Sequence, residues 1–253
     1  MGDALSSDPG EHFEVVLANP PFGKKSSTVI VGEDGRVSSE KDTIERDDFW
    51  ATTSNKQLNF VQHIKTLLAI HGRAAVVLPD NVLFEAGVGA DIRRDLMDKC
   101  RLHTILRLPT GIFYAQGVKT NVLFFEKISQ AAIGSTQDVW VYDMRANAPK
   151  FGKRTPLTHA HFADFVKAYG QDPNGKSPRT DEGEQGRWRQ FSRDWIAQEK
   201  GDSLDIAWLK DDNAEDAADL PEPAVLAREA VDELNGAVAE LEAILAELGE
   251  ACE

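Results

Sequence analysis

A short apolar run that stops at two consecutive prolines constrains this 253-residue chain more than any other feature. Residues 13–18 are mostly apolar and predict a buried strand, and Asn19, Pro20, Pro21 and Phe22 follow directly. Each proline fixes its φ and lacks an N–H group, so the turn is rigid and leaves nearby carbonyl groups available. With an amide beside it and an aromatic ring to stack on, this turn predicts a site for a planar, amino-bearing base. The alternative is an ordinary strand-to-loop turn.

Strand signals recur through the first 145 residues. Apolar, β-branched runs predict further strands at 73–79, 103–109, 120–125 and 138–143. Because helical periodicities separate several of these runs, we expect an α/β fold with a parallel sheet. The strands at 103–109 and 120–125 have no helix between them, so we expect this pair to be antiparallel and to lie at the sheet edge.

Two helices are predicted in the same part of the chain. The first follows residues 54–57, Ser-Asn-Lys-Gln, which fit a capping box, and Gly72 is expected to end it as a C-cap. Apolar positions spaced by three and four predict its buried face: Leu58, Val61, Ile64 and Leu68. The second helix is predicted over residues 91–100.

Polar segments lie between and after these elements. Residues 23–53 predict a long loop with a small hairpin over 29–37. Residues 170–190 are rich in Gly, Pro, Asp and Arg and predict a flexible linker. The basic run at 187–189, Arg-Trp-Arg, fits contact with nucleic acid, but a solvated linker is the better interpretation. The acidic residues 211–223 predict a second linker.

The last segment predicts a helix with one apolar seam. Apolar residues recur there at spacings of three and four without a break: Val231, Leu234, Val238, Leu241, Leu245 and Leu248. Such a heptad seam suits packing against a helix of another subunit. Packing back onto its own domain explains the seam equally well.

Charge and cysteine content narrow the possible environments. The formal net charge is −14 and the pI is about 4.9, which argues against a chain that grips nucleic acid without help. The two cysteines, Cys100 and Cys252, provide neither a disulfide framework nor a zinc spacing, and no metal site is expected. No signal peptide and no membrane-spanning apolar run are evident, so a cytoplasmic protein is expected.

Several further motifs follow the Asn-Pro-Pro-Phe run in a fixed order. They are Asn59-Phe60-Val61-Gln62-His63, Gly72-Arg73-Ala74-Ala75-Val76-Val77-Leu78-Pro79, Asn81-Val82-Leu83-Phe84, Leu106-Arg107-Leu108-Pro109, Gly111-Ile112-Phe113 and Gly117-Val118-Lys119-Thr120-Asn121-Val122-Leu123-Phe124-Phe125. Together they resemble the modification (M) subunit of type I restriction-modification systems, an adenine-N6 DNA methyltransferase. The resemblance is dense over residues 1–145, and 204–209 are a weaker echo of it.

The resemblance implies a fold, a cofactor and partners. It implies part of a class I S-adenosylmethionine-dependent methyltransferase, a Rossmann-like mixed sheet, followed by a C-terminal helical segment. Residues 1–150 would be the C-terminal half of the catalytic domain, 151–220 a linker with a short mixed segment, and 221–253 a docking helix. The implied cofactor is S-adenosylmethionine. The implied partners are DNA and the specificity (S) and restriction (R) subunits.

The cofactor-binding region departs from the family pattern. The family places a glycine-rich cofactor loop upstream of Asn-Pro-Pro-Phe, and here 18 residues precede Asn19. Gly87-Val88-Gly89 does not follow a buried strand and is not taken as that loop. We therefore expect the C-terminal part of an M subunit, inactive alone, with Asp3 as a weak candidate for contacting the cofactor.

The resemblance also implies roles for individual residues. Asn19 and the Pro20 carbonyl group would bind the amine of a flipped adenine, Pro21 would keep the turn rigid, and Phe22 would stack on the base. Phe113 is the candidate for the opposite face of the base, with plain core packing as an equal alternative and Tyr114 as its substitute. Lys24 and Lys25 are candidates for contacting DNA phosphates, and solvated lysines in a polar loop are an equal alternative. His63 is interpreted as a structural histidine rather than a base.

Two other functions fit parts of the sequence. One keeps the amino-methyltransferase chemistry but acts on RNA or on a protein glutamine. The other is a non-catalytic interaction fragment that docks on a specificity subunit, an interpretation that the departure at the cofactor loop favours.

Overall fold

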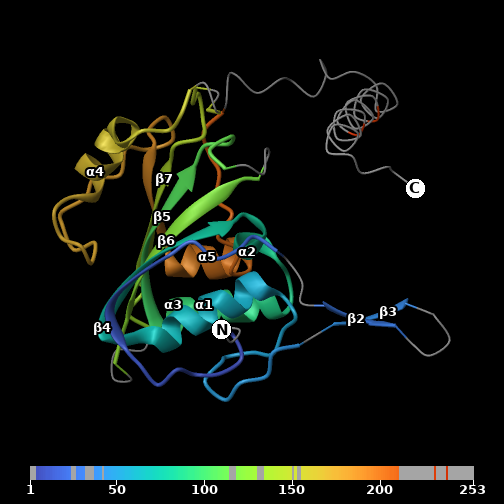
Figure 1. Ribbon diagram of the computed structural model, residues 1–253. Coiled ribbons are helices and arrows are strands. Elements are labelled where there is room, and N and C mark those ends of the chain that lie inside the picture. The colour runs from blue at the N-terminus through green and yellow to red at the C-terminus, as the bar shows by residue number, and fades with distance from the viewer. Residues whose placement is uncertain are drawn as a thin grey trace. The chain divides into compact units, whose positions relative to one another are not determined.

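The computed structural model describes residues 4–23, 27–31, 37–41, 43–113, 118–129, 134–149, 151–152 and 155–210, together with Val231 and Val238. Of residues 27–31 and 37–41, only the backbone is described. The chain divides into two compact units, Met1–Asp211 and Asp212–Glu253. The helices and strands named below all belong to the first unit (Figure 1).

A six-stranded mixed sheet forms the centre of the first unit (Figure 1). Its strand order is β1-β4-β6-β5-β7-β8. The pairs β1–β4 and β5–β7 are parallel, whereas β6 is antiparallel to both its neighbours and β8 is antiparallel to β7. The strands are β1 (Phe13–Ala18), β4 (Leu68–Pro79), β5 (Cys100–Leu108), β6 (Thr120–Lys127), β7 (Asp138–Asp143) and β8 (Trp188–Ser192). The predicted α/β class with a mixed sheet is confirmed.

Apolar side chains form a core on each face of the sheet. Along β6, Leu123 and Phe125 belong to one cluster, whereas Val122 and Phe124 pack with the other, as expected for alternating side chains. The first cluster lies against α1 (Lys56–Leu67), α2 (Asn81–Phe84), α3 (Val88–Lys99) and α5 (Arg193–Lys200). The second lies against η2 (His159–Phe162) and α4 (Ala163–Tyr169). The sheet is therefore the middle layer of three.

The position of β6 corrects one prediction. The strands at 103–109 and 120–125 are antiparallel as predicted, but β6 lies between β4 and β5, so it is not at the sheet edge. The edge strands are β1 and β8. The reason is that β6 carries apolar side chains on both faces, and a strand of this kind is most stable where both faces are covered.

The start and end of α1 also differ from prediction. Asn55, rather than Ser54, is the N-cap, and its Oδ1 accepts hydrogen bonds from the N–H groups of Gln57 at 2.9 Å and Leu58 at 3.4 Å. The predicted C-cap, Gly72, lies inside β4 instead of ending the helix. A Cβ there would come within 2.7 Å of the Phe13 carbonyl oxygen, so this glycine permits the close approach of β1.

Two other local predictions can be compared with the structure. The second helix, predicted from residue 91, begins three residues earlier, at Val88, and ends at Lys99. The predicted hairpin is confirmed as β2 (Ser27–Val31) paired antiparallel with β3 (Val37–Lys41). The residues between the two strands, 32–36, lie outside the described residues.

Residues 170–190 were predicted to form a flexible linker, but they are part of the packed unit. Trp188 begins β8 and is 1% exposed. The Arg187 side chain donates to the carbonyl oxygens of Asp143 at 2.8 Å and Ala146 at 2.6 Å. Its guanidinium group therefore binds the protein's own backbone. The prediction failed because β8 has few apolar residues and is held by its pairing with β7, which lies far away in sequence.

The segment after α5 is also anchored. Leu204 is 1% exposed, and its N–H group donates to the Leu83 carbonyl oxygen at 2.8 Å. Arg107 donates to the Ile206 carbonyl oxygen and, at 3.2 Å, to Asp205 Oδ1. Of the predicted terminal helix, the structure describes Val231 and Val238, which are helical and about half exposed. Its docking role stays a prediction.

Candidate active site

The predicted Asn-Pro-Pro-Phe turn shares one end of the sheet with several polar residues from other strands. Asn19 follows the carboxyl end of β1, Asp80 follows β4, and Asp143 ends β7. Because parallel strands present their carboxyl ends at a common edge, these segments meet there, and ligands of open α/β sheets bind at such an edge. Asn121, near the start of the antiparallel β6, reaches the same edge.

The Asn-Pro-Pro-Phe turn combines exposed and buried groups. Asn19 and Pro21 are exposed, Pro20 is buried, and Phe22 is half-buried. Among the described residues, the Asn19 side chain has no hydrogen-bond partner. An amide that is held by a rigid turn and faces solvent is available to a ligand.

The structure brings Phe113 to Phe22. The two rings meet edge to face, with their centroids 5.3 Å apart and their planes at 89°. Phe113 is therefore an aromatic neighbour of the turn, and its role at the opposite face of the base stays a prediction.

Gly111 fixes the loop that carries Phe113. Its φ is +80°, in the region that favours glycine. A Cβ at this position would overlap the Phe151 carbonyl oxygen. The loop after β5 is thus pressed against the backbone at Phe151, which sets where Phe113 lies.

Gln57, a residue that the sequence analysis did not assign to the site, binds the turn directly. Its Nε2 donates to the Phe22 carbonyl oxygen at 2.5 Å, and its Oε1 accepts from Asn81 Nδ2 at 2.7 Å. The side chain is 1% exposed. The capping-box interpretation directed this glutamine to its own helix, and the Asn-Val-Leu-Phe motif was the one signal that pointed to Asn81.

A second polar network, also missed from the sequence, lies at the same edge. Arg145 donates to both carboxylate oxygens of Asp80, at 2.9 and 2.5 Å, and Asn121 Nδ2 donates to Asp80 Oδ1 at 2.7 Å. Arg145 also donates to the carbonyl oxygens of Leu108 at 3.0 Å and Thr120 at 2.8 Å. One guanidinium group thus ties together the ends of β4, β5 and β6.

This network sets the charge state of Asp80. Burial by itself raises the pKa of the carboxyl group, but the hydrogen bonds and charge of Arg145, helped by Asn121, outweigh it and lower the pKa. The group is therefore ionised at neutral pH. Both of its oxygens accept hydrogen bonds from Arg145 or Asn121, so it acts as a structural anion rather than a base.

Other predicted residues fall outside this cluster. His63 is 6% exposed, and its Nδ1 accepts a hydrogen bond from Arg46 Nη1 at 3.1 Å, in keeping with a structural histidine. Asp3, Lys24, Lys25 and Tyr114 lie outside the described residues. Within the described ranges, no group of His, Cys, Asp and Glu side chains is arranged to hold a metal ion. No helix among the residues searched is long and apolar enough to cross a membrane.

The glycine-rich loop expected to hold S-adenosylmethionine has no counterpart among the described residues. Gly87 is the N-cap of α3 and follows the short helix α2 rather than a strand. In the part of the chain that is described, no other glycine-rich loop follows a buried strand.

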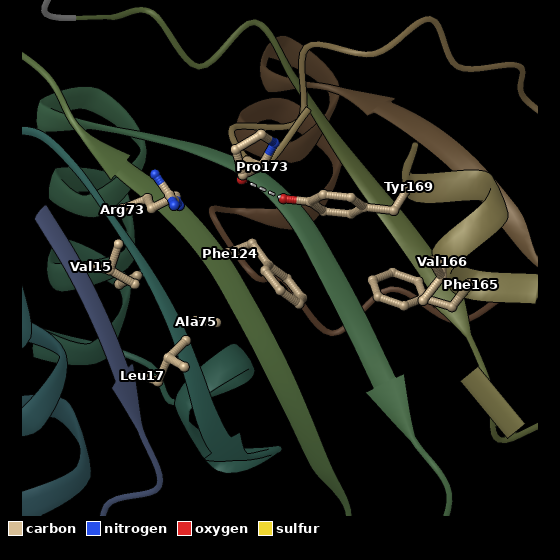
Figure 2. A pocket seen from close by; sticks show the side chains of 10 residues that line it. Val15, Leu17, Arg73, Ala75, Phe124, Phe165, Val166, Tyr169 and Pro173 are labelled. Atoms are coloured by element: carbon tan, nitrogen blue, oxygen red, sulfur yellow. Dashed lines mark hydrogen bonds between the residues drawn. The ribbon is translucent and has the colours of Figure 1, made fainter. Parts of the chain in front are cut away.

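A separate hollow lies on the sheet face that α4 partly covers. It has a volume of about 250 Å³ and is bounded by β1, β4, β6 and α4. Figure 2 shows Val15, Leu17 and Phe124 lining it, with Tyr169 donating to the Pro173 carbonyl oxygen at 2.8 Å. Its lining includes none of the residues of the Asn-Pro-Pro-Phe turn.

Comparison with known proteins identifies the family. Residues 1–199 match the family described as N-6 DNA Methylase. The chain is 52% identical to the type I restriction enzyme EcoKI methylase subunit of Escherichia coli (strain K12), over 98% of this chain and 50% of that protein. It is also 52% identical to the StySPI methylase subunit of Salmonella potsdam, over the same shares. The chain thus spans about half the length of these relatives.

Solved structures give the same result. The crystal structure of the EcoKI M protein superposes with a TM-score of 0.71 at 50% identity, covering 99% of this chain and 53% of that one. A modification subunit of a putative type I restriction enzyme from Vibrio vulnificus YJ016 superposes with a TM-score of 0.57 at 25% identity, covering 77% of this chain and 38% of that one. The site described above lies within the residues that the family model matches, and the chain belongs to the N-6 DNA methylase family.

Proposed function

We propose that this chain forms the adenine-binding part of a DNA methyltransferase, which transfers the methyl group of S-adenosylmethionine to N6 of adenine. The observation that carries the proposal is the Asn-Pro-Pro-Phe turn. Asn19, whose amide has no hydrogen-bond partner among the described residues, lies three residues before the aromatic Phe22, in a turn that follows the carboxyl end of β1. An amide next to an aromatic ring matches the two parts of adenine, its exocyclic amine and its flat ring.

The polar part of the turn acts on the amine. The amine donates its two N–H groups to Asn19 Oδ1 and to the Pro20 carbonyl oxygen. In free adenine the nitrogen lone pair is delocalised into the ring, so the amine is a weak nucleophile. Two fixed acceptors favour a more tetrahedral nitrogen and aim its lone pair at the methyl donor, so catalysis here consists of orientation and electrostatics.

The aromatic part of the turn holds the base outside the duplex. An adenine in a duplex cannot reach this edge, so it is flipped out of the helix. Phe22 stacks on the flipped ring, and such a contact is worth about 1–3 kcal/mol per base. Phe113, now in contact with Phe22, moves aside or forms the second wall.

The proposal includes partners. Phosphate neutralisation dominates affinity for DNA, and a chain with a net charge of −14 does not provide it. We infer that a specificity subunit supplies the grip on DNA and the choice of sequence, and that a restriction subunit completes the assembly. The relatives are named as methylase subunits of restriction enzymes, which supports this inference.

Methylation by the full-length subunit that contains this sequence, assembled with its specificity subunit, tests the proposal. Labelled S-adenosylmethionine and an unmethylated duplex should give N6-methyladenine. Asn19→Ala and Phe22→Ala should each lower the rate about 100–1000-fold without changing the melting temperature. Phe13→Ala, at the other end of the same strand, is the matched control and should retain activity. Transfer to cytosine or to protein, or near-normal rates in both site variants, would reject the proposal.

A further inference from the structure

We propose that Gln57 is a positioning residue that holds the adenine-binding turn in its working conformation through the Phe22 carbonyl group. The inference rests on the proposed function, because the turn matters only if it binds the base. Gln57 Nε2 donates to the Phe22 carbonyl oxygen at 2.5 Å, and the glutamine itself comes from α1, which is separate in sequence from the turn.

The turn depends on an outside donor because of its own composition. Pro20 and Pro21 have no N–H groups, so neither can donate a backbone hydrogen bond of the kind that usually fixes a tight turn. The Phe22 carbonyl group is the first group after the prolines that the described contacts tie to another element. Its direction fixes the peptide plane after Phe22 and therefore helps set where the ring points.

The orientation of the Gln57 amide follows from its partners. A carbonyl oxygen can only accept, so the NH₂ end of Gln57 faces Phe22 and the oxygen end faces Asn81. Asn81 Nδ2 then donates to that oxygen at 2.7 Å. Gln57 is 1% exposed, so water does not replace either contact.

The backbone that carries Gln57 is also held in place by hydrogen bonds at the start of α1. Asn55 caps α1 through the N–H group of Gln57 at 2.9 Å, and its Nδ2 donates to Glu85 Oε2 at 2.7 Å. Asn81 begins α2, directly after Asp80. The glutamine thus connects the turn to the starts of two helices, and a displacement of about 1 Å in a reacting group can cost about 100-fold in rate.

The decisive variant is Gln57→Glu, because it changes the donor into a group that titrates. An ionised carboxylate would face the Phe22 carbonyl oxygen and repel it, whereas the protonated acid would donate as the amide does. In the assembled methyltransferase, kcat should be about 100-fold below wild type at pH 8, with KM for DNA unchanged. The ratio of variant to wild-type kcat should rise as the pH is lowered to 6. Gln57→Leu should be slow at every pH.

Gln62→Glu is the matched control. Gln62 is a fully buried glutamine of the same helix, but it binds the backbone of Trp50 and Ala51 instead of the turn. Its relative kcat should not depend on pH. A pH-independent ratio for Gln57→Glu, or the same pH dependence for Gln62→Glu, would overturn the inference.

A protein-only measurement separates this inference from the proposed function. With 4-fluorophenylalanine at residue 22, the ¹⁹F resonance should shift in Gln57→Glu at pH 8 and return towards the wild-type position at pH 6. It should not respond in Gln62→Glu. If the resonance follows this pattern while no adenine is methylated, the proposed function is wrong but the positioning contact is real. An unchanged resonance would reject the positioning role.

Discussion

The guanidinium group of Arg145 grips both carboxylate oxygens of Asp80, at 2.9 and 2.5 Å, although 65 residues separate the two in sequence. The pair is largely shielded from solvent, with side-chain exposures of 12% for Arg145 and 17% for Asp80. The pair lies at the carboxyl ends of the parallel strands, the same end of the sheet as the Asn-Pro-Pro-Phe turn.

Asp80→Asn should destabilise the protein by about 2–4 kcal/mol, because Arg145 would be left with an unmatched charge in a poorly solvated place. Urea unfolding followed by circular dichroism measures the change. Asp95→Asn is the control, since Asp95 pairs with Lys99 on the helix surface, and it should cost less than about 1 kcal/mol. Equal losses in the two variants would mean that the Asp80–Arg145 pair is no stronger than a surface pair.

His103 should make stability depend on pH in mildly acidic solution. Burial, with the positive charges of Arg101, Arg179 and Lys176, lowers its pKa from 6.5 to about 3. Below pH 6.5 the unfolded chain therefore binds a proton that the folded protein does not, and stability falls as the pH falls towards 3. The slope contributed by this one group approaches about 1.4 kcal/mol per pH unit.

His103→Phe isolates this effect, because phenylalanine keeps a ring against Phe124 and Tyr169. Between pH 6.5 and 4.5, its free energy of unfolding should change less with pH than that of the wild type. Above pH 4.5, Asp80 stays ionised in both states and adds little, since its folded pKa is lowered. Identical slopes for variant and wild type would show that His103 is not the titrating group.

Gly111→Ala should displace the loop that carries Phe113. The new methyl group would meet the Phe151 carbonyl oxygen, in addition to the cost of a positive φ. We expect a loss of about 2–4 kcal/mol in unfolding free energy and slower methyl transfer by the assembled enzyme.

Gly134→Ala is the control for the backbone part of this effect. Gly134 has nearly the same φ, +81°, but nothing lies within 4 Å of the position of its Cβ. It should cost only about 1 kcal/mol. If the two variants lose the same stability, backbone strain alone explains the effect of Gly111→Ala.

The terminal helix should be needed for assembly rather than for the fold of the first unit. Replacing Leu241 and Leu245 by Asp puts charges into the heptad seam and should weaken binding to the specificity subunit. Co-purification measures binding, and thermal unfolding checks residues 1–211. Glu240→Gln with Glu242→Gln is the control outside the seam. Unchanged co-purification, or a lower melting temperature of the sheet, would favour packing of the helix on its own chain.

The sequence predicted those elements whose signal is local. The strand at 138–143 matches β7 to the residue, and the run at 120–125 lies within β6, because both are apolar runs. The insertion of β6 between β4 and β5 depends on contacts across the whole sheet. The predicted position at the sheet edge was therefore wrong. β8 was missed because its residues pair with β7 without being strongly apolar themselves.

The same contrast holds for the site. Asn19 and Phe22 were found because a strand followed by two prolines is a strong local pattern, and their roles stay predictions. Gln57 and Arg145 were missed because their partners, Phe22 and Asp80, lie 35 and 65 residues away. A local sequence rule assigned Gln57 to a capping box, but its side chain instead binds the Phe22 carbonyl oxygen, which is distant in sequence.

The outer edge of β1 has a consequence for handling the protein. Within the described residues this edge strand pairs with β4 alone, and its apolar side chains remain accessible, with Leu17 79%, Val15 45% and Phe13 44% exposed. An unpaired edge of this kind accepts strands from other molecules, while the net charge of −14 keeps those molecules apart. Salt screens the repulsion but not the backbone hydrogen bonds. The solubility of the isolated chain should therefore fall as ionic strength rises, opposite to the behaviour of a protein that precipitates through charge pairing.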